Sequence, residues 1–256
     1  MENFQYILPE IFISISIMLF LLVGVFKKNS ASLIYNLSNI SLVILLALII
    51  NLSSLDTIYL FNESYLIDNL SNYMKIILVG SGIFVMLTGS KYIQVINLNK
   101  IEYPILILSS ILGMMIMISS NDLIVFYMGL ELQSLALYVL ASFNRDNLLS
   151  TESGLKYFVL SALSSGLLLY GCSLTYGFSE STNFDQILIN STEFNYGTTF
   201  GIVFILVGLA FKISAVPFHM WAPDVYQGSP TSVTLFFAIL PKIAALSVFI
   251  KFLYTP

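Results

Sequence analysis

The chain has 256 residues, of which 57% are hydrophobic and only 9% are charged, and its formal net charge is −4 at pH 7. This composition is too apolar to cover the surface of an ordinary soluble domain, so it indicates an integral membrane protein. The single histidine, the single cysteine and the absence of a basic patch argue against a metal site, a disulfide framework and a nucleic-acid-binding surface.

Long apolar stretches recur along the chain, and each has about the 20 residues that a helix needs to cross a bilayer. They predict about eight spans, at residues 7–26, 33–52, 70–90, 103–119, 122–142, 154–178, 197–216 and 229–252. The stretches do not alternate apolar and polar residues, so they predict helices rather than the strands of a membrane barrel. The predicted fold is therefore all-α, a polytopic transmembrane helix bundle.

Loop charges predict the orientation, because positively charged loops stay on the cytoplasmic or matrix side. The basic residues of the loops all follow the first, third and fifth spans: Lys27, Lys28, Lys91, Lys100 and Arg145. The N-terminus is therefore expected outside. Lys75 and Lys251 depart mildly from this pattern, and both can snorkel at an interface. The first ten residues contain no lysine or arginine, so the first span is expected to be retained rather than cleaved as a signal peptide.

Four ionisable residues fall inside the predicted spans, namely Glu131, Lys156, Lys212 and Lys242. A charge at the centre of a membrane helix costs about 2.5–3.5 kcal/mol on insertion scales, so such residues commonly mark ion or proton paths. Glu131 lies about nine residues, or roughly 14 Å, from the outer end of its span, and Lys242 is equally central. Each could instead be a hydrogen-bonded or snorkelling side chain, an alternative that is strongest for Lys156, near the inner boundary.

Prolines predict two interruptions near these lysines. Pro217 follows Lys212 by five residues and indicates a broken helix, of the kind that lines water-filled cavities in transporters. Pro241 removes one helical hydrogen bond from the eighth span and frees a carbonyl for an amine or a water. His219 and Asp224 follow the break in an inner loop and could exchange protons with the aqueous phase. A loop histidine without such a role is an equally good interpretation.

One acid and three amines within a membrane bundle are the groups that a proton path requires, because the proton affinity of a buried amine changes with its solvation and with a nearby carboxylate. We therefore expect Glu131 and Lys212 to approach each other closely, with Lys156 and Lys242 in the same central layer. The alternative is a receptor or another helix bundle without transport, in which the buried charges only pair.

Four segments resemble the antiporter-like membrane subunits of respiratory complex I, NADH:quinone oxidoreductase: FYMGLELQSLALYVL, GLKYFVLSALSSG, GLAFKISAVPFHMWAPDVYQGSPTSVT and ILPKIAAL. The resemblance covers roughly the last 150 residues. It implies that Glu131 is the fifth-helix glutamate, which pairs with the seventh-helix lysine, Lys212. It also implies that Lys156 is the sixth-helix lysine and Lys242 a bridging lysine at the bilayer centre. A lysine rather than a histidine in the eighth helix resembles the subunit N branch, which is subunit 2 in mitochondria.

The resemblance implies a proton-translocating subunit that is driven by quinone reduction elsewhere in the complex. Residues 1–100 would supply helices one to three, and residues 101–256 the first five-helix antiporter repeat, helices four to eight. Because the bacterial family has about fourteen helices in two inverted repeats, we expect the coding sequence to continue beyond Pro256. Other possibilities are a subunit of a cation/proton antiporter or of a membrane-bound hydrogenase.

The same resemblance implies no cofactor and no redox centre in this chain. NADH, FMN, iron–sulfur clusters and quinone are expected in other parts of the complex, and quinone is not expected to bind this subunit directly. The expected partners are other membrane subunits of complex I and the lipid bilayer, with no nucleic acid. The expected location is a bacterial inner (plasma) membrane or a mitochondrial inner membrane.

Overall fold

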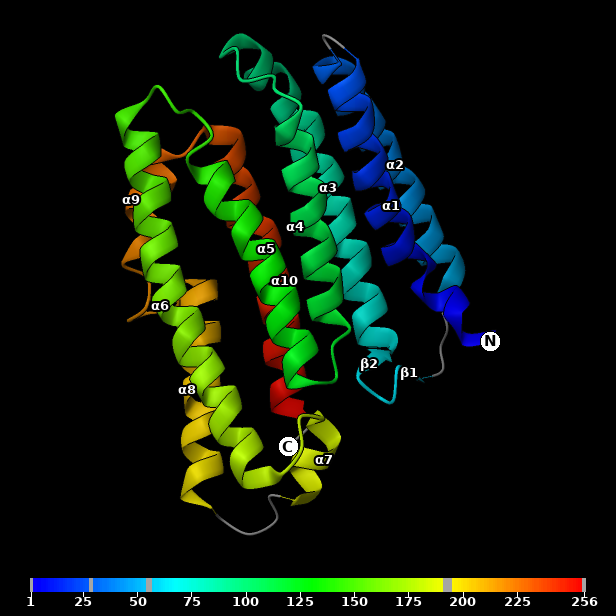
Figure 1. Cartoon of the computed structure of the whole chain (residues 1–256), viewed down its shortest axis with the longest axis vertical. Coiled ribbons are helices and arrows are strands. Elements are labelled where there is room, and N and C mark those ends of the chain that lie inside the picture. Colours follow the sequence, from blue (N-terminus) through cyan, green and yellow to red (C-terminus); the bar gives the residue numbers. More distant parts are fainter. Residues whose placement is uncertain (1, 28–29, 54–56, 191–194, 255–256) are drawn as a thin grey trace.

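The computed structural model describes residues 2–27, 30–53, 57–190 and 195–254, and within them nearly every element is a helix. The elements in chain order are η1 (Glu2–Ile7), α1 (Leu8–Phe26), α2 (Ala31–Leu52), β1 (Ile58–Leu60), β2 (Tyr65–Ile67), α3 (Asn69–Val95), α4 (Glu102–Ile118), α5 (Leu123–Ala141), α6 (Leu148–Ser179), α7 (Phe184–Asn190), α8 (Tyr196–Ile213), α9 (Trp221–Gly228) and α10 (Thr231–Tyr254). Figure 1 shows the long helices side by side in one bundle. The predicted all-α fold is confirmed.

Within the described part, seven helices are long and apolar enough to cross a membrane, and α4 is a slightly shorter apolar helix of 17 residues. Together they match the eight predicted spans. The short helices α7 and α9, and the antiparallel hairpin of β1 and β2, were not predicted. The chain is therefore a multi-pass membrane protein.

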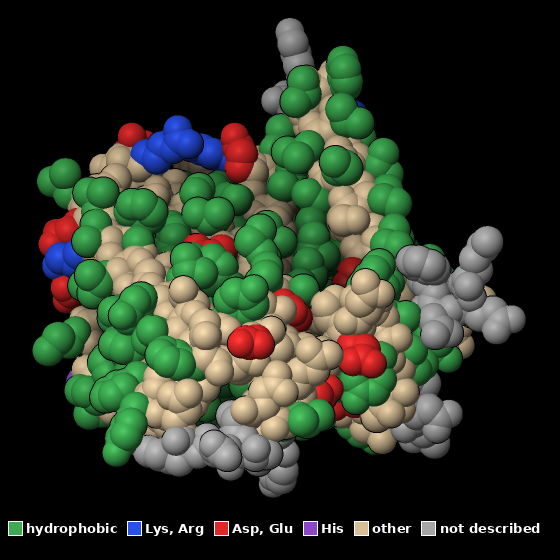
Figure 2. Space-filling model, turned by 60° about the horizontal axis from the view of Figure 1, so that its bottom comes forward, with side chains coloured by type: hydrophobic (Ala, Val, Ile, Leu, Met, Phe, Trp, Pro, Cys, Tyr) green, Lys and Arg blue, Asp and Glu red, His purple; other side chains and the backbone are tan. Residues whose placement is uncertain are grey.

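The outer surface of the bundle has the composition that lipid requires. Large apolar side chains such as Met18, Phe84 and Leu163 expose 58–68% of their surface, and Figure 2 shows hydrophobic side chains over much of the visible face. Soluble monomers rarely expose apolar patches of this extent. At the lower end, which comes forward in Figure 2, several acidic side chains are visible. This distribution agrees with the orientation predicted from the basic loops, which lie at the opposite, inner side.

Aspartate and asparagine side chains cap the N-termini of several helices. Asp68 accepts a hydrogen bond from the backbone N–H of Ser71 in a capping box at the start of α3. Asp122, Asn147 and Asn195 cap α5, α6 and α8 in the same manner. Each cap satisfies donors that the first turn of a helix leaves without partners. The membrane helices consequently begin at defined polar residues.

Glycines let two helix pairs approach until their backbones touch. A Cβ atom on Gly113 of α4 would lie 2.6 Å from the backbone nitrogen of Gln133 in α5. A Cβ atom on Gly171 of α6 would lie 2.7 Å from the carbonyl oxygen of Gly201 in α8. Small residues are used in this way where membrane helices pack closely. The two contacts fix α5 against α4 and α8 against α6, which are the helices that carry the predicted site.

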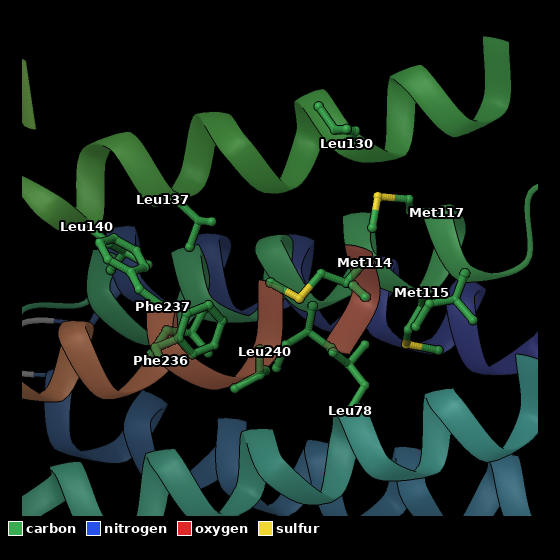
Figure 3. Packing of buried hydrophobic residues seen from close by; sticks show 14 of the residues in the cluster. Leu78, Met114, Met115, Met117, Leu130, Leu137, Leu140, Phe236, Phe237 and Leu240 are labelled. Carbon is green, nitrogen blue, oxygen red and sulfur yellow. The ribbon is translucent and has the colours of Figure 1, made fainter. Parts of the chain in front are cut away.

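The apolar core lies where α3, α4, α5 and α10 meet, as Figure 3 shows. Phe236 and Phe237 of α10 are at most 2% exposed, and they lie among Leu78, Met114 and Leu137, none of which exceeds 1%. Truncating a buried phenylalanine to alanine typically costs about 3–5 kcal/mol. The helix that carries Lys242 is therefore firmly held on its apolar side.

Lys75 and Lys251, which could have snorkelled at an interface, are both buried. Lys75 is 3% exposed and Lys251 is 7% exposed, so neither amine extends to the surface of the bundle. Lys75 instead forms a buried ion pair with Glu10, which lies 65 residues earlier in the chain. The hydropathy of a single span cannot identify a partner that lies this far away in the chain.

Candidate functional site

Lys212 is the most buried of the four predicted ionisable residues, with 4% of its surface exposed. It lies in the last turn of α8, and its amine Nζ donates to the hydroxyl oxygens of Ser134 in α5, at 2.8 Å, and Ser161 in α6, at 2.6 Å. The amine also lies 5.9 Å from the centre of the Tyr138 ring. Neutral groups from two neighbouring helices therefore hold the Lys212 amine away from lipid.

Glu131 lies on the same face of α5 as Ser134, which follows it by three residues. Its Oε1 atom is buried and has no hydrogen-bond partner among the described residues. No ion pair shorter than 4.0 Å joins Glu131 to Lys212 in the described part of the chain, although their charges interact across the gap. The structure thus brings both residues to one site, but the expected direct pair is not formed.

A break in the seventh membrane crossing places Lys212 at a helix end, as the sequence predicts. Helix α8 stops at Ile213, the next residue adopts a left-handed conformation with φ 63°, and α9 begins at Trp221 after a segment that contains Pro217. The indole N–H of Trp221 donates to the carbonyl of Phe211 at 3.0 Å. The C-terminal end of a helix carries a partial negative charge, which favours an ammonium group there.

The two residues predicted in the loop after the break have different environments. His219 is exposed and lies in the segment between α8 and α9. Asp224 lies inside α9 rather than in a loop, which corrects the prediction, and it accepts a hydrogen bond from the amine of Lys156 at 2.7 Å. Only His219 therefore remains in irregular structure beside the break.

Lys156 lies at the edge of the bundle rather than in a layer with Lys212, so that part of the prediction is wrong. Its side chain is 43% exposed and pairs with Glu152, one turn earlier in α6, and with Asp224 in α9. These three residues border a cavity of about 90 Å³ between α6 and α9. Solvent screens half-exposed ion pairs of this kind, so they contribute little to stability.

Lys242 lies half-buried in the middle of α10, beside α9. Its amine is 5.5 Å from the centre of the Tyr226 ring, a distance that permits a cation–π contact. Pro241 lies inside α10, as predicted, and the helix continues through it. Lys242 therefore faces an aromatic ring, and Lys212 faces serine hydroxyls.

An aromatic row between the two lysines was not predicted. Four rings form it: Tyr138, Tyr157, Trp221 and Tyr226. Successive ring centres lie 5.1, 4.7 and 6.0 Å apart. The amine of Lys212 lies beside the first ring and that of Lys242 beside the last. The sequence does place Tyr157 after Lys156, and Trp221 and Tyr226 after Lys212. Ring contacts between different helices cannot be derived from this order.

These groups are suited to holding protons rather than metals. No group of three or more His, Cys, Asp or Glu residues that could hold a metal ion occurs within the described residues. The site instead combines a carboxylate that has one buried oxygen without a partner, two lysine amines, and serine and tyrosine hydroxyls. Each of these groups can gain, lose or hydrogen-bond a proton.

Residues 120–255 match the family described as NADH:quinone oxidoreductase/Mrp antiporter, transmembrane. The chain belongs to this family. The matched segment makes up more than half of the chain and includes all four predicted ionisable residues, whereas α1, α2 and α3 precede it. The resemblance inferred from the four sequence segments is therefore confirmed at the level of the family.

The similarity to curated relatives extends through the whole chain. It is 69% identical over 258 residues to NADH-quinone oxidoreductase subunit N of Pelagibacter ubique, which covers 100% of this chain and 54% of the relative. The corresponding protein of Rhodospirillum rubrum is 49% identical, with 97% of this chain and 52% of that protein covered. The chain thus spans about half the length of the curated relatives it matches.

Among solved structures, respiratory complex I from Thermus thermophilus contains a chain that matches with a TM-score of 0.82 and 27% identity, covering 95% of this chain and 52% of the other. The fold described above is therefore shared with about half of a chain in this complex.

Proposed function

We propose that the chain forms part of the proton-translocating membrane subunit N of an NADH:quinone oxidoreductase. The observation that carries the proposal is the buried amine of Lys212, which donates to the hydroxyls of Ser134 and Ser161. Ser134 lies one helical turn from Glu131, whose buried Oε1 has no hydrogen-bond partner among the described residues. The high identity to subunit N of Pelagibacter ubique, along the whole chain, supports the choice of complex.

The hydroxyl partners suit a lysine that changes its protonation state. A serine hydroxyl both donates and accepts, so Ser134 and Ser161 can accept from an ammonium and can donate to the neutral amine that remains after a proton leaves. A carboxylate partner only accepts and would favour the ammonium alone. The absence of a direct Glu131 pair in this structure is therefore compatible with proton release from Lys212.

In the proposed path, Glu131 and Lys212 form the loading site and Lys242 receives the proton next. Lys156, Asp224 and His219 lie on the inner side and would exchange protons with the aqueous phase. Moving one charge against a potential of 100 mV costs about 2.3 kcal/mol, so a carrier must change its proton affinity appreciably. A shift in the position of Glu131 relative to Lys212 would supply such a change, because an approaching carboxylate favours the ammonium.

We further propose that the chain works with other membrane subunits of complex I in a bacterial inner membrane. NADH, FMN, iron–sulfur clusters and quinone would be bound by other subunits, and the coupling would reach this chain as shifts of charge. The residues of the proposed path would then act only on protons.

A subunit of a cation/proton antiporter or of a related respiratory complex is the second candidate. The membrane-bound sulfane sulfur reductase, an archaeal respiratory membrane complex, contains a chain that matches with a TM-score of 0.86. At 22% identity, this likeness indicates a common fold and does not extend to function. The identity to subunit N favours the first proposal.

The test is Lys212→Met in the assembled complex, with Lys91→Met, an exposed lysine of α3, as the matched control. Proton uptake into inverted membrane vesicles on NADH addition should be lost in the first variant and retained in the second. NADH oxidation by an artificial acceptor should be unchanged in both, because electrons do not pass through this chain. Normal proton uptake by fully assembled Lys212→Met would refute the proposal.

A further inference from the structure

A second group of buried ionisable side chains lies outside the proposed path. Glu10 of α1, Tyr65 of β2 and Lys75 of α3 meet at one point, and each is at most 6% exposed. The Lys75 amine lies 2.6 Å from Glu10 Oε1 and donates to the Tyr65 hydroxyl at 3.1 Å. The Tyr65 hydroxyl in turn donates to the same Oε1 atom at 2.8 Å. The cluster is therefore a closed hydrogen-bonded triangle.

One oxygen atom of this cluster takes no part in the triangle of hydrogen bonds. Glu10 Oε2 is buried and has no hydrogen-bond partner among the described residues. A buried carboxylate oxygen without a partner loses its hydration and gains nothing in return. Apolar residues of similar volume are often as stabilising as a buried ion pair, or more so. Stability alone therefore does not account for the cluster, and the orphaned oxygen indicates a place where a proton can bind.

Tyr65 is suited to remain a donor while Glu10 changes state. Burial, and secondly the charge of Glu10, raise the pKa of the Tyr65 hydroxyl well above its usual value. The hydroxyl is therefore not ionised at any working pH. It can hold Oε1 in place whether or not Oε2 carries a proton.

Helix α10 brings a second amine to this cluster. Lys251 lies in its last turn, is 7% exposed, and interacts electrostatically with Lys75 and with Asp68 and Asp185 at the outer rim. Lys242 lies nine residues earlier on the same helix, which at 3.6 residues per turn is about two and a half turns and places the two lysines on opposite faces. One helix thus connects the proposed path to this cluster.

The cluster lies near the outer end of the bundle. Lys75 follows the capping residue Asp68 by seven residues, a depth of about 10 Å at 1.5 Å per residue. Figure 1 shows the start of α3, the β1–β2 hairpin and the end of α10 at the same lower end of the molecule. Glu10, Tyr65 and Lys75 also precede the segment that matches the family. The cluster is therefore separate from the Glu131 and Lys212 site in both sequence and space.

We propose that Glu10, Tyr65 and Lys75 form a second proton-binding site on the outer side of the bundle, with Glu10 Oε2 as the acceptor. A proton from a hydronium ion forms an O–H bond at Oε2 and leaves water behind. Tyr65 and Lys75 keep their bonds to Oε1. The positive charge of Lys75 opposes this protonation, so removing that charge alters the proton occupancy of Glu10.

The test is infrared difference spectroscopy of the full chain, in the assembly in which it is extracted, reconstituted in lipid nanodiscs and titrated between roughly pH 5 and 10. A Glu131→Gln background removes the carboxyl signal of the proposed loading site. We expect a pH-dependent carboxylic-acid band that is lost in Glu10→Gln and retained in Glu102→Gln, which alters an exposed carboxylate. Because the readout is proton binding, it does not depend on NADH turnover or on the proposed function.

The variant Lys75→Met tests the same proposal by removing the positive charge that lies 2.6 Å from Glu10 Oε1. It should move the band to higher pH, since removing an adjacent positive charge makes the protonated form easier to reach. The proposal is overturned if no carboxyl band depends on Glu10, in which case Glu10 and Lys75 form a permanent ion pair. If Glu10→Gln does not accumulate, an unchanged band in Lys75→Met overturns it instead.

Discussion

The amine of Lys212 in α8 donates a 2.6 Å hydrogen bond to the hydroxyl of Ser161 in α6, 51 residues earlier in the chain. The Tyr138 hydroxyl of α5 donates to the same oxygen at 2.8 Å. Ser161 therefore joins three helices at the centre of the proposed path. Its chemistry decides which protonation state of the lysine is favoured.

Ser161→Asp should abolish proton uptake, because a carboxylate beside Lys212 favours the ammonium and opposes proton release. Ser161→Thr keeps the hydroxyl and should retain most of the activity. The measurement is proton uptake into inverted vesicles, normalised to the amount of assembled complex. The matched control is Ser164→Asp, on the same helix but without a hydrogen bond to Lys212. Equal loss in both aspartate variants would count against this explanation.

Lys242→Ala and Lys242→Arg should both lose proton uptake on NADH addition. Alanine has no proton to carry, and arginine keeps its charge but does not release its proton at a workable pH. NADH oxidation by an artificial acceptor and the amount of assembled complex should stay near normal in both. Substantial uptake by Lys242→Arg would show that a fixed charge is sufficient at this position.

Tyr226→Phe should leave the thermal stability unchanged or slightly higher. The Tyr226 hydroxyl is buried without a partner among the described residues, so removing it relieves a desolvation cost of about 1–3 kcal/mol, partly offset by the small void that remains. The ring beside Lys242 is retained. Tyr226→Leu removes the ring and should lower the midpoint of thermal unfolding, measured by intrinsic fluorescence. A strong destabilisation by Tyr226→Phe would reveal a hydrogen bond that this structure does not contain.

Gly113→Ala should destabilise the bundle by about 1–3 kcal/mol, because a methyl group there would press on the backbone of α5 and force two packed helices apart. Gly166→Ala is the matched control, since a Cβ atom at Gly166 meets nothing within 4 Å. The control should be neutral or stabilising by about 0.5–1 kcal/mol from helix propensity. Thermal unfolding of both variants in the same nanodiscs provides the comparison. Equal effects would mean that α4 and α5 are less tightly packed than described.

The membrane spans, the basic inner loops and the break after Lys212 could be predicted because each depends on neighbouring residues in the sequence. Apolar runs, loop charges and Pro217 are local signals. The partners of buried charges could not be predicted in this way. Lys75 meets Glu10, and Lys156 meets Asp224, across 65 and 68 residues of chain respectively. Which face of a helix meets which neighbour is decided by tertiary packing, which the pattern of a single span does not contain.

The same limit explains why the site differs in detail from its prediction. The central position of Glu131 in its span predicted the site, and Ser134, one turn later in α5, binds Lys212. The sequence could not show that the amine of Lys212 would bind a hydroxyl rather than the carboxylate. That choice depends on how the helices pack, including the close approach of α8 to α6 at Gly171 and Gly201.

Helix α6 runs unbroken for 32 residues, or about 48 Å at 1.5 Å per residue, and it packs against both α8 and α9. Both halves of the interrupted crossing, α8 and α9, therefore pack against this one continuous helix. The Lys156–Asp224 ion pair links α9 to α6 at the surface, while the glycine contact brings α8 close to α6. Bending at the break would change the angle between the halves without detaching either one. A small tilt of α8 could then alter the distance between Glu131 and Lys212 while the inner end of the crossing stays in place.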